Sequence, residues 1–300
     1  MKRALALALL ALALAAPTAL AAPSEYILPG DSVFPEGITT RPGTDQFFVS
    51  STSDGTIFRG TLGKPRTRVF LAPGQDGRVL ANGLRATSDH LIVAGSVTGL
   101  LFVYDIRTGR LVRRFATGSG GLLNDVAVTQ AGDVYVTDSM RGLLFRVKAR
   151  ALAKRTSATR RLRPFVRFGD TPVGSYANGI VPAGRRYVLV VGLSTGVLGR
   201  VDLESGRVRT VKGINLPAGD GLAITGHTLY GVNSGSRVTE VKLSRDWLRG
   251  STQRQITSPL FRLPTTVAIA GRRLLVVNSQ FDRRGMTPAL PFTVAGVRRP

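Results

Sequence analysis

Six side chains that could bind a hard cation recur along the chain in similar local settings. Each stands just before a short apolar stretch and carries an oxygen atom: Glu36, Asn82, Asn124, Asn178, Asp220 and Thr265. A single Asn or Asp before a strand is usually a turn residue, but Glu is not a favoured turn former. Two carboxylates brought together in one register would need a counter-charge. We therefore interpret the set as candidate ligands of a divalent cation.

The available donor atoms indicate which cation. The chain has no cysteine, and neither of its two histidines belongs to the set. Carboxylate and amide oxygens suit Ca²⁺ first, with Mg²⁺ or Mn²⁺ as alternatives. Zn²⁺ is less favoured because it prefers nitrogen and sulfur ligands. The sequence predicts Ca²⁺ as the cofactor.

The same six residues mark an internal repeat. Their successive spacings are 46, 42, 54, 42 and 45 residues, and each is followed by strand-like segments separated by glycine-containing turns. A period in the forties with several strands per unit is the signature of a β-propeller blade. We predict an all-β, six-bladed β-propeller. Because the innermost strand of each blade lines the central channel, the six side chains should form a ring there.

The two ends of the chain fit a closed propeller. The last repeat contains only three strand-like segments, PTTVAIAGR, RLLVVNSQFD and PFTVAGVRR, whereas SEYILPG at residues 24–30 precedes the first repeat. We predict that this N-terminal segment supplies the missing strand of the last blade, which leaves no long unpaired edge. Residues 24–300 then form one domain. The longest spacing contains a basic insertion at about residues 148–168, interpreted as a solvated outer loop or hairpin.

Residues 1–21 have the features of a secretion signal peptide. Lys2 and Arg3 precede an Ala/Leu-rich run, and Ala19-Leu20-Ala21 fits a small-x-small cleavage site. The run is too short to span a bilayer comfortably, and Pro17 interrupts it. We predict a periplasmic or secreted protein without stable membrane insertion.

The chain carries a large positive charge, which bears on its partners. The formal charge is +23, and loss of Lys2 and Arg3 leaves 23 − 2 = +21. We predict no nucleic-acid partner, because no basic motif with interleaved aromatics is present and an exported protein rarely meets nucleic acid. Charge-driven contact with anionic envelope polymers remains an alternative.

Four short motifs carry a family resemblance over about residues 30–282. FPEG at 34–37, LNDVAV at 123–128, ANGI at 177–180 and GDGLAI at 219–224 resemble the senescence-marker/gluconolactonase family of six-bladed propellers. The resemblance implies a catalytic Ca²⁺ held by Glu36, Asn178 and Asp220, with Asn124 contacting the metal or the substrate. It also implies hydrolysis of a lactone or related ester, with Asp220 as general base or nucleophile.

One position departs from the family pattern. Sugar-lactone members often carry an arginine two residues before the asparagine that Asn124 matches, and here that residue is Leu122. A less polar channel mouth favours a more apolar lactone or ester, although Leu122 could equally serve packing. With Asn124, Asn82 and Thr265, it completes the predicted set of substrate-contacting residues.

Two other functions remain compatible with these observations. In one, the propeller is a non-enzymatic binding protein whose calcium ion is structural and pins the blades together. In the other, it is a strictosidine-synthase-like enzyme, although no residue of the sequence singles out that chemistry.

Overall fold

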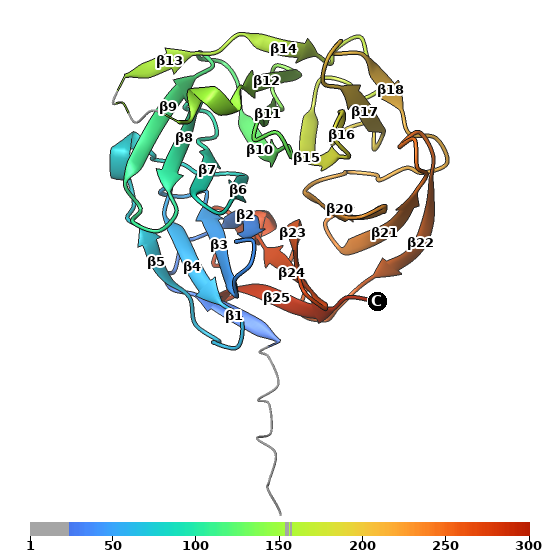
Figure 1. Cartoon of the computed structure of the whole chain (residues 1–300). Helices are drawn as coiled ribbons and strands as arrows, with labels where there is room; N and C mark the ends of the chain where they lie inside the picture. Colours follow the sequence, from blue (N-terminus) through green and yellow to red (C-terminus); the bar gives the residue numbers. More distant parts are fainter. Residues whose placement is uncertain (1–23, 154–155, 157) are drawn as a thin grey trace, which may run out of the picture.

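The computed structural model describes residues 24–153, 156 and 158–300 as a closed ring of β-sheets (Figure 1). The six sheets surround a central channel, which confirms the predicted all-β, six-bladed propeller. The predicted signal peptide, residues 1–21, lies outside the described residues. Among the described residues, no helix is long and apolar enough to cross a bilayer.

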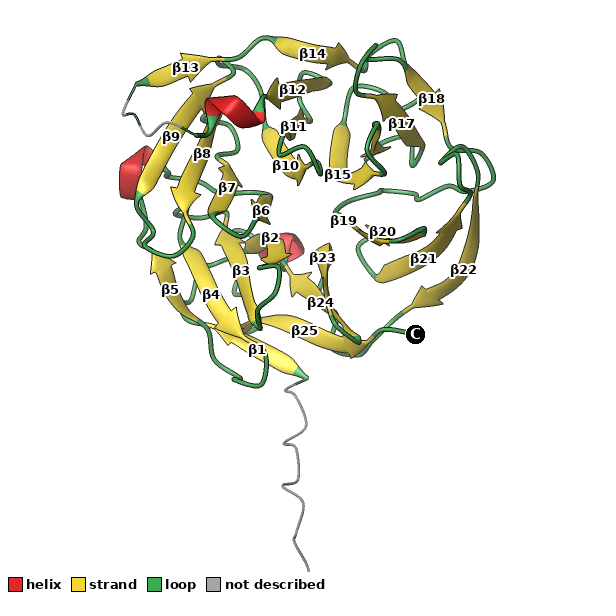
Figure 2. Cartoon of the chain, in the orientation of Figure 1, coloured by secondary structure: helices red, strands yellow, loops and turns green. Residues whose placement is uncertain are grey.

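The first three blades run from the innermost to the outer strands in chain order (Figure 2). Blade one consists of β2 (Pro35–Thr40), β3 (Gln46–Ser51), β4 (Ile57–Thr61) and β5 (Arg68–Leu71). Blade two consists of β6 (Leu84–Ala86), β7 (His90–Ala94), β8 (Leu100–Asp105) and β9 (Leu111–Ala116), with β13 (Thr159–Arg161) added outside β9. Blade three consists of β10 (Leu123–Val128), β11 (Val134–Asp138), β12 (Leu143–Val147) and β14 (Pro164–Arg167).

The other three blades follow the same plan. Blade four consists of β15 (Ala177–Ala183), β16 (Tyr187–Gly192), β17 (Leu198–Asp202) and β18 (Val208–Thr210). Blade five consists of β19 (Leu222–Thr225), β20 (Thr228–Asn233), β21 (Arg237–Leu243) and β22 (Gly250–Ile256). Blade six consists of β23 (Pro264–Ala270), β24 (Arg273–Asn278), β25 (Phe292–Arg298) and β1 (Glu25–Leu28). Short 3₁₀ helices lie at Gln75–Gly77, Ala149–Ala151 and Phe281–Arg283.

The ring is closed by the N-terminal strand, as predicted. β1 is antiparallel to β25, with Glu25 opposite Ala295 and Leu28 opposite Phe292. This pairing joins residues from the two ends of the chain in one sheet, so blade six has no unpaired β25 edge.

The core lies between the blades. Six clusters of buried apolar side chains alternate with the six sheets, and each cluster draws residues from two neighbouring blades. Phe48 of blade one, for example, packs in the same cluster as Leu91 and Phe102 of blade two. Strand residues therefore bury side chains on both faces, which explains the long apolar runs in the sequence.

The β13 part of the basic insertion is exposed, as predicted, but it pairs with another blade instead of forming only a loop or hairpin. After β12 the chain forms the 3₁₀ turn Ala149–Ala151, crosses to blade two, and runs parallel to β9 as β13 before returning as β14. Leu162 continues this pairing, since its N–H bonds the Ala116 carbonyl at 2.8 Å. The outer edge of β9 offers unpaired backbone groups, and β13 satisfies them.

Candidate metal centre

The six residues that define the repeat occupy equivalent positions at one end of the channel. In four blades the first residues of the inner strand form a β-bulge. It lies between Pro35 and Ile38 in blade one and at the matching place in β10, β15 and β23. In the other two blades Asn82 and Asp220 precede the inner strand and bond the second strand through their N–H groups, each at 2.9 Å. A bulge re-aims side chains at a strand end. We call the six residues the channel ring.

The residue after each ring member brings neighbouring blades into close contact. Four of these residues are glycines: Gly37, Gly83, Gly179 and Gly221. A Cβ atom on Gly179 would lie 2.2 Å from the Asp220 carbonyl oxygen, and one on Gly83 would lie 2.5 Å from the Asn124 carbonyl oxygen. Only glycine allows the backbones to approach so closely. The ring is therefore fixed by backbone contacts between blades.

The ring side chains are largely removed from solvent, and three of them have an oxygen without a partner. Glu36, Asn124 and Asn178 are 4%, 7% and 4% exposed, respectively, and Asp220 is partly exposed. The atoms Glu36 Oε2, Asn124 Oδ1 and Asn178 Oδ1 are buried and accept no hydrogen bond from the described residues. Buried polar atoms are normally satisfied, and three unsatisfied acceptors in one ring fit a site for a cation.

A hydrogen-bond relay fixes the orientation of the Asn124 amide. Ser139 Oγ donates to the Ala177 carbonyl of blade four at 2.7 Å, which uses its only proton. It therefore accepts from Asn124 Nδ2, at 2.9 Å. With the NH₂ group held by Ser139, the amide oxygen is the atom of Asn124 left for a ligand.

Ser139 differs from the hydroxyl residues at matching places in other blades. Thr52 and Ser279 also follow the second strand, but their hydroxyls donate to Phe34 and Leu263 carbonyls of their own blade. Only Ser139 of these three reaches the next blade and a ring amide. Sequence reasoning missed this residue, because a serine after a strand is an ordinary turn residue.

Burial and nearby carboxylates disfavour the ionisation of both ring acids. Burial raises the pKa of Glu36 well above its usual range, and the charges of Asp220 and Asp125 raise it further. Burial and the Asp125 charge raise the pKa of Asp220 to about 7, against opposing hydrogen bonds from the Asn178 side chain and the Gly221 backbone. The Asn178 contact leaves its amide oxygen free, as Ser139 does for Asn124. A bound cation would relieve this repulsion.

Asp125, which directly follows Asn124, is a third buried acid beside the ring. It is 4% exposed, and its carboxylate accepts from the Val126 N–H at 2.8 Å and from the Ile180 N–H of blade four at 3.1 Å. Burial nevertheless raises its pKa, while the Arg85 charge lowers it. The repeat held a usable signal, because Asp125 stands where four other blades have glycine.

Arg85 provides a positive charge further along the channel. Its Nε donates to the Val126 carbonyl at 3.1 Å. It also lines a cavity of about 290 Å³ at the far end of the inner strands, together with Thr39, Ala223, Thr225 and Ile269. The channel therefore has an acidic end at the ring and a basic residue towards the opposite end.

The remaining predicted site residues lie as follows. Thr265 is buried in the ring, and its hydroxyl donates to the Glu36 carbonyl at 3.0 Å, so it links blade six to blade one. Asn82 is 9% exposed in the ring. Leu122 is partly exposed just before the ring, where its N–H bonds Asp138 Oδ1 at 3.1 Å. The Asp138 carboxylate is held in turn by Arg141.

The positions two residues before each ring member are all apolar or aromatic: Phe34, Leu80, Leu122, Tyr176, Ala218 and Leu263. Phe34, Ala218 and Leu263 have positive φ angles of 41°, 47° and 51°. Left-handed backbone is uncommon for such residues and occurs often at functional sites. Phe34 packs in the core against Phe292, whereas Leu122 and Leu263 remain partly exposed.

The donor set is mixed, and this limits which metals fit. In the described part of the chain, no three or more His, Cys, Asp or Glu side chains cluster as metal ligands. The ring instead offers two carboxylates and the unpartnered amide oxygens of Asn124 and Asn178, all of them hard donors. Such a set fits Ca²⁺ better than a transition metal.

Comparisons with known proteins support the fold. No protein-family model and no curated protein sequence matches the chain. Among solved structures, the chain is similar to the calcium-binding protein regucalcin from Agrobacterium tumefaciens strain C58, with 16% identity and a TM-score of 0.63 over 93% of this chain and 96% of that one. It is also similar to the Malassezia sympodialis allergen Mala s 1, with 13% identity and a TM-score of 0.68 over 92% and 96% of the two chains.

A third similarity is to a catalytically inactive virginiamycin B lyase from Staphylococcus aureus, solved with quinupristin. The identity is 17% and the TM-score 0.59, covering 85% of this chain and 80% of that one. At these identities the similarities show the fold alone. These proteins include a calcium-binding protein and an enzyme, so the propeller is compatible with either kind of function.

Proposed function

We propose that this chain is an exported, metal-dependent hydrolase of lactones or related esters, with Ca²⁺ as its ion. The observation that carries the proposal is the set of buried oxygens without partners on Glu36, Asn124 and Asn178, in one ring with the Asp220 carboxylate. Regucalcin, which is described as calcium-binding, has the same fold. Glu36, Asn124, Asn178 and Asp220 would hold the ion.

A hard divalent cation at such a site supplies Lewis-acid polarisation of a carbonyl oxygen and stabilises the negative charge that forms on it. Asp220 is the most accessible acid of the ring. It would take a proton from the attacking water or attack the carbonyl carbon itself. Asn178 orients the Asp220 carboxylate through its side-chain hydrogen bond.

The channel mouth bears on the substrate. Leu122 replaces the arginine expected for a sugar lactone, and the matching positions of the other blades are also apolar or aromatic. Partly exposed Leu80, Leu122 and Leu263 would contact an apolar substituent of the lactone or ester, with Asn82 and Thr265 deeper in the ring.

The test combines turnover with calcium binding. A panel of lactones and aryl esters is assayed with and without chelator, and the calcium-induced rise in melting temperature is recorded for the wild type, Asp220→Asn and Asp202→Asn. Asp202 lies on the outer strand β17 and provides a charge-matched control. Activity that survives both the chelator and Asp220→Asn would refute the metal-dependent hydrolase.

A structural role for the ion is the second candidate, and the backbone of the ring favours it. Ring carbonyls accept hydrogen bonds from neighbouring blades, as in Gly83 N–H to Asn124 at 2.7 Å and Gly221 N–H to Thr265 at 2.9 Å. A calcium-dependent melting temperature in a protein that turns over none of the panel would support this non-enzymatic binding propeller.

A further inference from the structure

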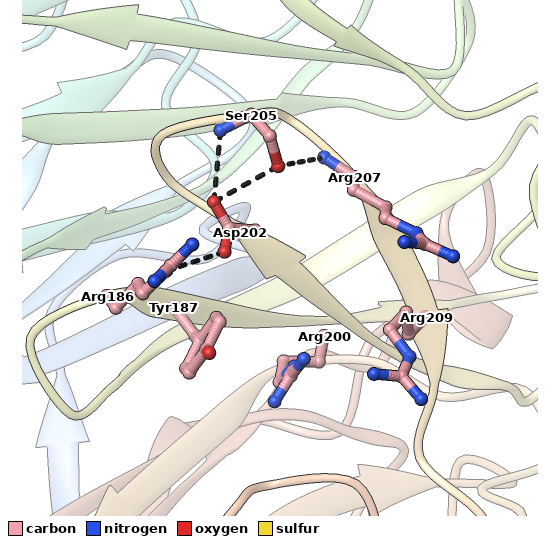
Figure 3. Close-up of a pocket in the computed structure, with 7 residues that line it drawn as sticks. All are labelled: Arg186, Tyr187, Arg200, Asp202, Ser205, Arg207 and Arg209. Atoms are coloured by element: carbon pink, nitrogen blue, oxygen red, sulfur yellow. Dashed lines mark hydrogen bonds and ion pairs between the residues drawn. The ribbon is translucent and has the colours of Figure 1, made fainter.

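A pocket of about 280 Å³ on the outer part of blade four is lined by four arginines and one carboxylate (Figure 3). We call it the arginine pocket, and its lining residues are Arg186, Tyr187, Arg200, Asp202, Ser205, Arg207 and Arg209. With four positive charges and one negative charge, its formal sum is 4 − 1 = +3. We propose that this pocket binds a phosphate group.

Both oxygens of the single carboxylate in the pocket already accept hydrogen bonds. Asp202 Oδ2 accepts from Arg186 Nε at 2.7 Å, and Oδ1 accepts from the Ser205 backbone and hydroxyl at 3.0 and 3.1 Å. These bonds lower the pKa of Asp202 to about 2. Asp202 therefore neutralises Arg186 and offers little to the other arginines.

Arg200 is a buried cation without a carboxylate partner among the described residues. It is 8% exposed, its guanidinium lies 3.9 Å from the centre of the Tyr187 ring, and Nη1 donates to the Asp246 carbonyl at 2.6 Å. Its Nε has no acceptor in the described chain. A buried charge without compensation is costly.

A second buried arginine shows what a purely structural role requires. Arg78 is 0% exposed and also lacks a carboxylate, but its donors bond the Gly55 carbonyl, the Ala72 carbonyl and the Tyr104 hydroxyl at 2.5–2.8 Å. Three acceptors replace an anion at Arg78. Arg200 has one hydrogen-bond acceptor among the described residues, the Asp246 carbonyl, so the protein satisfies its donors far less completely.

The strand pairing places another arginine directly beside Arg200. Arg209 of β18 is its cross-strand partner, and the two guanidinium groups lie next to each other in Figure 3. Like charges in such positions are destabilising. Blade five shows the usual solution, because the equivalent cross-strand pair there is Glu240 and Arg254, joined by an ion pair of 2.9 Å.

The chemistry of the pocket selects a phosphate over a single carboxylate. Guanidinium groups bind phosphate oxygens with paired, charge-assisted hydrogen bonds. A phosphate group, free or in a diester, has enough oxygens for both Arg200 and Arg209 and supplies negative charge that offsets part of the excess positive charge. The exposed Arg207 adds a further positive charge at the edge.

The test measures inorganic phosphate binding by calorimetry at pH 7.5 in moderate salt, with chloride as the competing anion. The variant is Arg209→Gln, because Arg209 is exposed and the fold should tolerate the change. The matched control is Arg68→Gln in blade one. Arg68 is also cross-strand to a stacked arginine, Arg59, which lies 4.9 Å over Phe70 but is only half-buried.

We expect Arg209→Gln to weaken phosphate binding about tenfold, which corresponds to the loss of a charge-assisted contact, while Arg68→Gln leaves it within about twofold. Equal effects of the two variants, or no phosphate binding by the wild type, would overturn the proposal. Capture on phosphatidylglycerol vesicles that Arg209→Gln abolishes, with phosphatidylcholine vesicles as the blank, would assign a lipid headgroup as the source. Phosphate binding without vesicle capture would assign the free ion.

Discussion

The channel ring and the arginine pocket are built from opposite charges and are positioned in different ways. At the ring, the pKa values of Glu36 and Asp220 are raised by burial and by neighbouring carboxylates, Asp125 among them, in a site held by backbone contacts between blades. In the pocket, Arg200 and Arg209 repel one another on the outer strands of one blade. Each site concentrates one sign of charge beyond what the described protein neutralises. Contacts between blades therefore position the ring, whereas the pocket depends on which side chains occupy paired positions of β17 and β18 within one blade.

The largest expected effect concerns Asp220. If the ring is a catalytic metal centre, Asp220→Asn should lower kcat/KM for the preferred lactone or ester by about 10²–10⁴-fold, as expected for loss of a general base or nucleophile. The calcium-induced thermal shift should fall at the same time. Asp202→Asn, which removes a carboxylate outside the ring, should leave both measurements unchanged. Equal effects of the two substitutions would show that the ring carboxylate has no special role in turnover or calcium binding.

The tight packing of the ring can be tested with glycine substitutions. Gly179→Ala would place a Cβ 2.2 Å from the Asp220 carbonyl oxygen, so we expect the free energy of unfolding to fall by more than about 2 kcal/mol. Gly169→Ala is the control, because no atom lies within 4 Å of its added Cβ and its φ is not in the left-handed region. Denaturant titration of both variants measures the effect. Similar stabilities would mean that the ring is less constrained than its geometry indicates.

The repulsion between ring acids predicts how stability depends on pH without metal. The pKa of Asp220 is raised from its ordinary value to about 7, and that of Glu36 is raised in the same direction. Their contribution to stability is therefore full below about pH 4 and is lost as the pH rises towards and through 7, at about 1.4 kcal/mol per unit of pKa shift as an upper limit.

We expect chelated protein to melt at a lower temperature at pH 8 than at pH 5, and Asp220→Asn to flatten this dependence. Calcium should reverse the trend, because it binds the deprotonated acids. Melting curves across this range provide the check, and a chelated wild type that grows more stable towards pH 8 would contradict the assigned repulsion.

A smaller effect should follow from the relay that orients Asn124. Ser139→Ala removes the acceptor of Asn124 Nδ2 and frees the amide to turn, so calcium affinity should weaken about tenfold, the lower range for residues that support metal ligands. Ser139→Thr keeps the hydroxyl and should bind calcium nearly as the wild type does. Calorimetric titration of both variants with calcium distinguishes a loss of calcium affinity, caused by the freed Asn124 amide, from a general loss of folding. Equal affinities of the two variants would show that Ser139 does not orient the amide.

The smallest effect is expected in the arginine pocket. In low salt without phosphate, Arg209→Gln should raise the free energy of unfolding by about 0.2–1 kcal/mol, because it removes a cross-strand pair of like charges. The gain should shrink as salt screens the repulsion. Urea titrations at two ionic strengths measure it, and a loss of stability would show that Arg209 serves the fold rather than a ligand.

The sequence predicted the fold well because the repeat is regular. Six equivalent positions gave the blade number, and the shortage of one strand in the last repeat gave the closure by β1. The same register identified all six ring members. It did not identify Ser139 as a positioning residue, because its hydrogen bonds to Asn124 and Ala177 join segments far apart in the chain.

The basic insertion is a second feature that the sequence predicted only in part. Composition indicated a solvated segment, and the described residues of β13 are indeed exposed. Its pairing with β9 depends on an open strand edge in a different blade. Neither local propensity nor charge carries that information.

The all-β class, the six blades, the closing strand and the positions of the oxygen-bearing residues follow from local patterns that repeat along the chain, so they could be predicted from it. The folded protein was needed to show which amide oxygens lack partners among the described residues, that Asp125 is a buried acid, and that Arg200 pairs with Arg209 across β17 and β18. These features depend on burial and on contacts between distant segments. Both change the energy of a charge far more than the identity of its neighbours in the chain.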